Sequence, residues 1–163
     1  MRPHLVLAAV PALCAAAASP GTGTFRGVAC VTTGAAVGRR VELADWGGEA
    51  NVVATASSGE TFVWAIYVLG NPGDEPRTVV VPPARLRDRR GRVWAEQGHS
   101  LDLREAARGV ETLSIAASER RAIEVWFELP EAAARERLTL LLADTGGDVA
   151  FGLGVPHAAA AEE

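Results

Sequence analysis

The sequence contains no lysine, so all 16 of its basic residues are arginine. The absence of lysine excludes Schiff-base chemistry and the lysine of a phosphate-binding P-loop. Three histidines and two cysteines leave little material for a metal site, and we expect neither a metal nor a cofactor. Twenty acidic residues give a formal net charge of -4 at pH 7. This charge argues against nucleic acid as a partner, because nucleic-acid binders normally carry a large positive excess.

Long helical patterns are also absent. No segment shows the 3.6-residue period of a crossover helix, so a parallel α/β sheet is not expected. The chain of 163 residues is 48% hydrophobic, which suffices for one domain with a sizeable core. Short apolar segments recur at roughly 8–12-residue spacing with turn residues between them, as in a sandwich or barrel. We predict an all-β fold, an antiparallel β-sandwich of about seven or eight strands.

Two segments carry the strongest strand signals. Residues 61–69 are apolar on both alternating faces and rich in β-branched and aromatic residues. They predict a central strand buried on both sides, with Phe62 and Trp64 in the core. Residues 122–129 alternate apolar and polar side chains, which is typical of a strand with one buried face.

The first 18 residues have the pattern of a signal peptide. Arg2 precedes fourteen uncharged residues, 5–18, that end in four alanines. This stretch is shorter than the roughly 20 residues of a membrane-spanning helix, and its end fits an A-x-A cleavage site. We predict that residues 1–18 are removed and that the protein is secreted or extracytoplasmic, with no transmembrane span afterwards. The alternative is an alanine-rich leader or a mis-assigned start codon.

The remainder of the chain is predicted to form one domain. Residues 19–36 are expected to be a spacer and a possible first strand, residues 37–157 the sandwich, and residues 158–163 a flexible tail. Cys14 is lost with the leader, which leaves Cys30 as the one thiol. Cys30 stands in an apolar stretch and is expected to be buried and free, although pairing between molecules stays open.

Strand and turn motifs follow one another in a fixed order along the chain. They are Val37-Gly38, Trp46 at a strand end, Gly59-Glu60-Thr61-Phe62, the Asn-Pro-Gly-Asp-Glu-Pro turn at 71–76, Leu86-Arg87-Asp88, Gly91-Arg92-Val93-Trp94, Ser118-Glu119, Phe127-Glu128-Leu129-Pro130 and Leu138-Thr139-Leu140. This order resembles the bacterial secreted immunoglobulin-like domains of unknown function, grouped with the immunoprotective extracellular immunoglobulin-like proteins of mycobacteria. The resemblance covers about residues 37–155. It implies an immunoglobulin-like β-sandwich exported to the cell surface or beyond, and it implies no reaction.

Two features depart from the pattern of that family. The residue before Cys14 is Leu13 rather than a small residue, so the sequence does not support a lipid anchor. Residues 116–119 replace the Pro-Gly turn that usually precedes the penultimate long strand, and we expect a different turn shape there.

A predicted hairpin with five arginines is the sharpest charge feature. Asp88 and Gly91 bracket its tight turn. Guanidinium groups bind carboxylates and phosphates through paired hydrogen bonds, so this hairpin is a candidate binding surface for an anionic envelope polymer, a lipid headgroup or an acidic protein. The alternative is that the arginines only keep a sheet edge soluble. The five arginines are Arg85, Arg87, Arg89, Arg90 and Arg92.

Trp126 is a second candidate binding residue. It lies between Glu124 and Glu128 on the polar face of its predicted strand. An outward Trp flanked by carboxylates can stack on a sugar or anchor a partner protein. The alternative is that a neighbouring strand or loop covers this face, which would make Trp126 a core residue.

No catalytic residues are predicted. His99, Ser100 and Asp102 are close in sequence, but a triad requires convergence in space, and no G-x-S-x-G motif is present. The acidic turns at 74–75 and 144–148 offer oxygen ligands, although turns use Asp and Gly in any case. We therefore expect a non-catalytic binding or scaffolding module whose partner is an anionic envelope component or another envelope protein. A structural module without a ligand, or a β-sandwich hydrolase or metal-binding protein, is the alternative.

Overall fold

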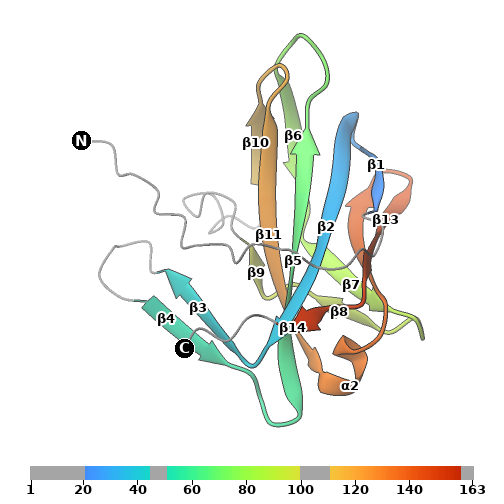
Figure 1. Cartoon of the computed structure of the whole chain (residues 1–163). Helices are drawn as coiled ribbons and strands as arrows, with labels where there is room; N and C mark the ends of the chain where they lie inside the picture. Colours follow the sequence, from blue (N-terminus) through green and yellow to red (C-terminus); the bar gives the residue numbers. More distant parts are fainter. Residues whose placement is uncertain (1–20, 45–50, 100–110, 159–163) are drawn as a thin grey trace.

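The computed structural model describes residues 21–44, 51–99 and 111–158. Within them, fourteen strand segments and one single-turn helix form a β-sandwich of two facing antiparallel layers (Figure 1). The all-β prediction is therefore confirmed. The number of segments exceeds the predicted number of strands in part because some segments are only two residues long.

A six-stranded sheet forms the first layer. Three long strands at its centre pair along most of their length: β2 (Val28–Gly38), β5 (Glu60–Gly70) and β11 (Arg120–Pro130). Three short strands lie at its edges: β1 (Thr22–Phe25), β9 (Gly98–His99) and β14 (His157–Ala158). Every pairing is antiparallel except that of β14 with β2.

Two smaller sheets form the second layer. One has the order β13-β12-β7-β8, and the other pairs β10 with β6. The strands are β6 (Arg77–Val81), β7 (Ala84–Asp88), β8 (Val93–Ala95), β10 (Glu111–Ile115), β12 (Leu138–Asp144) and β13 (Gly147–Gly154). Two elements lie outside these layers: the hairpin of β3 (Arg40–Ala44) with β4 (Asn51–Thr55), and the helical turn α2 (Glu131–Ala134) before β12.

The core lies between the two layers. Alternation along β5 directs Val63, Tyr67 and Leu69 inward, and all three are almost fully buried. Trp64 is only half-buried, on the opposite face, so the prediction that Trp64 belongs to the core is wrong. The physical reason is that the second layer packs on one face of β5, so the apolar run is not sandwiched on both sides. Phe62 is buried, as predicted.

One side of the sandwich is closed by a strand that changes layers. β8 belongs to the second layer and β9 to the first. Between them, the N–H of Glu96 donates to the carbonyl of Ala84 at 3.2 Å, and the N–H of Gln97 donates to the carbonyl of Trp126 at 2.8 Å. Val93 on β8 is 47% exposed. As an edge strand, β8 leaves one side of Val93 uncovered.

The opposite side is closed by a small polar network. The buried hydroxyl of Thr32 on β2 donates to the carbonyl of Gly152 on β13 at 2.7 Å and accepts from the N–H of Gly21 at 2.9 Å. A Cβ at Gly21 would approach the nitrogen of Gly152 to 2.6 Å, so this backbone contact requires glycine. Thr32 thus joins the two layers where their main chains meet.

A two-residue turn joins β1 to β2. Arg26 and Gly27 both have positive φ, 48° and 80°, the pattern of a type I′ hairpin turn. The Arg26 guanidinium donates to the carbonyls of Val80, at 2.9 Å, and Ala143, at 3.3 Å, and its Nε lies 3.4 Å from the Asp144 carboxylate. Arg26 therefore connects this turn of the first layer to both sheets of the second.

Both ends of the described chain lie in edge strands of the first layer. This layer begins at Thr22, so strands occupy most of residues 22–36, within the segment predicted to be a spacer and a possible first strand. Ala158, predicted to begin a flexible tail, is paired with Val37. Backbone pairing at an edge needs no apolar side chain, which is why hydrophobic patterning does not reveal it. The predicted signal peptide lies outside the described residues, as do Trp46, Ser100 and Asp102.

Candidate functional site

One buried carboxylate holds the turn of the arginine hairpin. Asp88 ends β7, and its Oδ1 accepts the N–H groups of Arg90 at 2.9 Å and Arg92 at 2.8 Å. Its Oδ2 lies 2.6 Å from Nε of Arg92. Gly91 has a φ of 83°, which favours glycine. Asp88 and Gly91 thus have the turn positions that the sequence predicts.

Asp88 and Arg92 together form a structural unit. Burial alone would raise the pKa of the Asp88 carboxyl, but hydrogen bonds from Arg92 and Arg90, together with the charge of Arg92, outweigh it and lower the pKa below 3.8. The Arg92 guanidinium also lies over the Trp94 ring, 5.4 Å from its centroid. Arg92 is therefore engaged in holding the hairpin.

Two further arginines of the hairpin are engaged in ion pairs. Arg85 pairs with Asp148 on β13, so its side chain crosses β12. It crosses at Leu141, which is directly opposite Arg85 and is 2% exposed. Nε of Arg90 lies 3.4 Å from the carboxylate of Glu136. Exposed ion pairs contribute only about 0–1 kcal/mol each, but these two fix where the side chains lie.

The Arg90–Glu136 contact brings a second arginine-containing segment beside the hairpin. This segment follows α2 and leads into β12, whose first pair with β7 is Leu138–Asp88. Figure 1 shows the β7–β8 turn and α2 at the same end of the sandwich. Four arginines here are exposed and have no ion pair or hydrogen bond among the described residues. We call them the arginine cluster: Arg87, Arg89, Arg135 and Arg137.

Sequence reasoning found only half of this cluster. It singled out Arg87 and Arg89 from their density in one hairpin, whereas Arg135 and Arg137 stand far along the chain. Only the pairing of β7 with β12 brings the two segments together. A search for further arginines immediately before or after predicted strands would have given the one available signal.

Trp126 lies on the outer face of the first layer and is half-buried. It is directly opposite Trp64 on β5, and its indole packs on Gly98 of β9, where an added Cβ would overlap the ring. Glu128 accepts a 2.7 Å hydrogen bond from the N–H of Ser57, so this carboxylate holds the loop before β5. Trp126 is thus neither enclosed between the layers nor fully exposed.

The carboxylates that flank Trp126 are in different environments. Burial raises the pKa of Glu124, and hydrogen bonds from Ser57 lower the pKa of Glu128. Opposite shifts are found in acid–base pairs, but these residues are four positions apart on one strand, which spaces their Cα atoms by about 13 Å. Trp126 lies between them on the same face of the strand.

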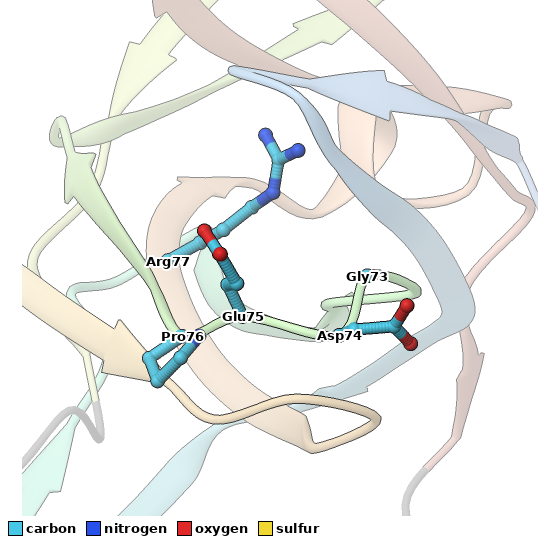
Figure 2. Close-up of a pocket in the computed structure, with 5 residues that line it drawn as sticks. All are labelled: Gly73, Asp74, Glu75, Pro76 and Arg77. Carbon is cyan, nitrogen blue, oxygen red and sulfur yellow. The ribbon is translucent and has the colours of Figure 1, made fainter.

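A hollow of about 410 Å³ lies along residues 73–77, at the end opposite the arginine cluster. The buried Asn71 shapes this loop: its amide donates to the carbonyl of Glu75 at 2.7 Å, and its oxygen accepts the N–H of Gly73 at 3.0 Å. The carboxylates of Asp74 and Glu75 point in different directions (Figure 2). Across the described residues, no three potential ligands group around a metal position.

Cys30, His99 and the search for a membrane-spanning helix each relate to a prediction from the sequence. Cys30 is buried and free, as predicted, and burial raises the pKa of its thiol to about 12. The main chain of His99 pairs with Val125 in the first layer, but the other members of the His99-Ser100-Asp102 alternative lie outside the described residues. In the part of the chain that the structure describes, no helix has the length and apolar character needed to cross a membrane.

Comparisons with known proteins give two similar solved structures. No known protein family matches the chain, and no curated protein is similar to it in sequence. An uncharacterized β-sandwich protein from Clostridium difficile 630 is 11% identical, with a TM-score of 0.48, over 81% of this chain and 89% of that chain. The yjhA protein from Bacillus subtilis is 10% identical, with a TM-score of 0.49, over 82% of this chain and 94% of that chain.

Proposed function

We propose that this chain is an exported, non-catalytic module that binds an anionic component of the cell envelope through the arginine cluster. The observation that carries the proposal is that the fold brings two separate segments to one end of the sandwich, each with two exposed arginines that have no ion pair among the described residues. A local excess of positive charge on a chain with a net charge of -4 attracts an anionic surface.

The guanidinium group of arginine suits this role for a reason beyond its positive charge. This planar group presents a fixed set of donors that bind carboxylates and phosphates in pairs. The neighbouring Arg85, Arg90 and Arg92 are already engaged with acidic side chains. Their ion pairs hold the hairpin in place and leave the arginine cluster free to meet a partner.

The proposal of export rests on the signal-peptide pattern of residues 1–18, and the resemblance to secreted immunoglobulin-like domains supports it. We also propose that the strands of the observed β-sandwich have an immunoglobulin-like arrangement. Recovery of the protein from its host, followed by determination of its N-terminal residue, tests the export step. A chain that begins at Ser19 supports export, and a chain that retains residues 1–18 contradicts the predicted cleavage.

Co-sedimentation with envelope fractions of the host tests the binding. The protein, in the form that the host produces, is compared with Arg89→Ser/Arg137→Ser at low and at physiological salt. Arg90 and Arg92 stay unchanged because they hold the turn. Arg77→Ser/Arg120→Ser is the matched control, since it removes the same charge from exposed positions at the opposite end.

We expect the unmodified protein and the control to sediment and the Arg89/Arg137 variant to remain in solution. We also expect salt to weaken the binding, because it screens exposed charges. Equal sedimentation of all three proteins would place binding elsewhere, with Trp126 as the next residue to change. If none sediments, the envelope proposal is wrong and the module is structural or binds a soluble partner.

A further inference from the structure

The outer face of the second layer carries one row of residues with a distinct composition. Strand pairing places Arg87 of β7 opposite Thr139 of β12, and Thr139 opposite Gly152 of β13. Val93 of β8 is opposite Arg87 on the other side. These four residues lie side by side across four strands. We call them the Arg87 row.

The Arg87 row has free space at Gly152, whereas the Arg85 side chain covers the adjacent row. A Cβ added at Gly152 would meet nothing within 4 Å, so there is free space beside the half-buried Thr139. In the adjacent row, Arg85 is opposite Leu141, and its ion pair with Asp148 covers that position. The same row thus holds this open space, a hydroxyl beside it and a guanidinium one strand further, and neither of these two groups has an ion pair or hydrogen bond among the described residues.

Two more arginines flank the Arg87 row on the side of the β7–β8 turn. Arg89 and Arg137 each lie one residue beyond the Asp88–Leu138 pair, which is the neighbour of the Arg87–Thr139 pair. Both are exposed. The three guanidinium groups give this face a local positive charge, which favours an anion whose several oxygens can accept from more than one of them.

The donor set matches phosphate better than carboxylate. A carboxylate presents its two acceptor oxygens in one plane, whereas the oxygens of a phosphate are arranged tetrahedrally and can accept from two guanidinium groups and a hydroxyl that approach from different sides. We propose that the Arg87 row binds a phosphate group of an anionic phosphodiester polymer of the cell envelope, with Gly152 leaving the space and Thr139 donating its hydroxyl. This inference rests on the proposed function and names the ligand class of the same surface.

The surroundings favour a polymer over the surface of a lipid bilayer. Interfacial binding to a bilayer draws on buried apolar area as well as charge. Val93 is the large hydrophobic residue exposed in the Arg87 row, and Leu141 of the next row is buried. A polymer needs only a shallow surface with repeated cationic contacts, which the row and its two flanking arginines provide.

The test compares a phosphate polymer with a carboxylate polymer of equal charge. Binding of inorganic polyphosphate and of polyglutamate to the purified protein is measured by titration over a range of salt concentrations. Vesicles of phosphatidylglycerol form a third arm, at matched phosphate concentration. Gly152→Leu fills the open space without changing charge. Gly146→Leu is its matched control, because Gly146 lies in the turn between β12 and β13 and a Cβ added there would also meet nothing within 4 Å.

We expect polyphosphate to bind about tenfold more tightly than polyglutamate, and Gly152→Leu to remove about that factor. The slope of log affinity against log salt should stay unchanged in Gly152→Leu and fall by about 2 in Arg89→Ser/Arg137→Ser. Thr139→Val should reduce the preference for phosphate, since it removes only the hydroxyl. Gly146→Leu should bind like the unmodified protein, and a thermal melt of each variant confirms that it is folded.

Equal affinity for the two polymers would overturn the phosphate inference, and so would an unchanged affinity in Gly152→Leu. Tighter binding to the vesicles than to polyphosphate would replace the polymer by a lipid surface. None of these results touches the proposed function as long as envelope co-sedimentation still depends on Arg89 and Arg137. Loss of that dependence would remove the proposed function itself.

Discussion

Asp88 is the residue on which the geometry of the arginine hairpin depends. Its carboxylate is buried and accepts hydrogen bonds from two backbone N–H groups and from Arg92. We expect Asp88→Asn to lower the free energy of unfolding by about 1–3 kcal/mol at neutral pH, because the charge-assisted contacts are lost and a buried amide cannot replace them all.

The same residue predicts a dependence of stability on pH. Its folded pKa lies below the 3.8 of a free carboxyl, so its stabilising contribution is complete above that value and is lost as the pH falls through the folded pKa. Urea unfolding at neutral pH and near pH 2 measures the difference between the unmodified protein and Asp88→Asn. The difference should shrink at low pH, and an equal difference at both pH values would contradict this account.

The burial of Cys30 leads to a prediction about how fast its thiol reacts. Burial raises the pKa of its thiol to about 12, so almost no thiolate is present at pH 8 in the folded protein. We expect a thiol reagent to label Cys30 only as fast as the protein unfolds. Cysteine at the exposed position Thr145 is the control and should label at once in the folded state. Immediate labelling of Cys30 would contradict its burial.

At the scale of elements, the β1–β2 turn sets two effects against each other. Arg26 occupies a left-handed conformation that Asn tolerates better, and relief there is worth about 0.4–1 kcal/mol. Its guanidinium, however, donates to two carbonyls of the second layer, and hydrogen bonds of charged groups contribute about 1.5–3 kcal/mol. We therefore expect Arg26→Asn to be destabilising by about 1–2 kcal/mol in urea unfolding. A more stable variant would show that the cross-layer contacts contribute little.

The short strand β9 depends on a glycine. Because the Trp126 indole packs on Gly98, we expect Gly98→Ala to displace the ring and to cost about 1–3 kcal/mol. Tryptophan fluorescence and chemical unfolding measure the two effects. Gly152→Ala is the control and should change stability by less than about 0.5 kcal/mol, since its new methyl group meets no neighbour. An unshifted emission spectrum in Gly98→Ala would contradict the packing.

The elements differ in how far the sequence alone predicts them. β5 and β11 are found within two residues of their ends because their side chains alternate over many positions. β1 and β14 are paired through main-chain groups at the edge of β2, so their side chains carry no apolar pattern. The half-burial of Trp64 could not be predicted either, since periodicity does not say which face of a strand the second layer covers.

For the whole molecule, the candidate site shows the same limit. Local density of charge identifies the hairpin, but not which of its arginines are free: Arg85 and Arg90 pair with Asp148 and Glu136, which lie far along the chain. The same non-local pairing of strands adds Arg135 and Arg137 and places Thr139 and Gly152 beside Arg87. A surface assembled from four strands depends on which strands pair with each other. The pattern of apolar and polar residues in one sequence does not predict that pairing.

Both ends of the described chain pair with the same strand, and this has a consequence for how the chain can be connected. Thr22 is opposite Val31 of β2, and His157 is opposite Ala36, so the two ends stand about 16 Å apart along one edge. A linker of about eight residues spans that distance. We expect a circular permutant that joins residue 158 to residue 21 and opens between Gly146 and Gly147 to fold, as circular dichroism and a thermal melt would show. An unfolded permutant would mean that the order of synthesis matters to folding. A folded one would make the sandwich, in effect, a closed loop of chain whose starting point is a matter of genetic encoding and not of structure.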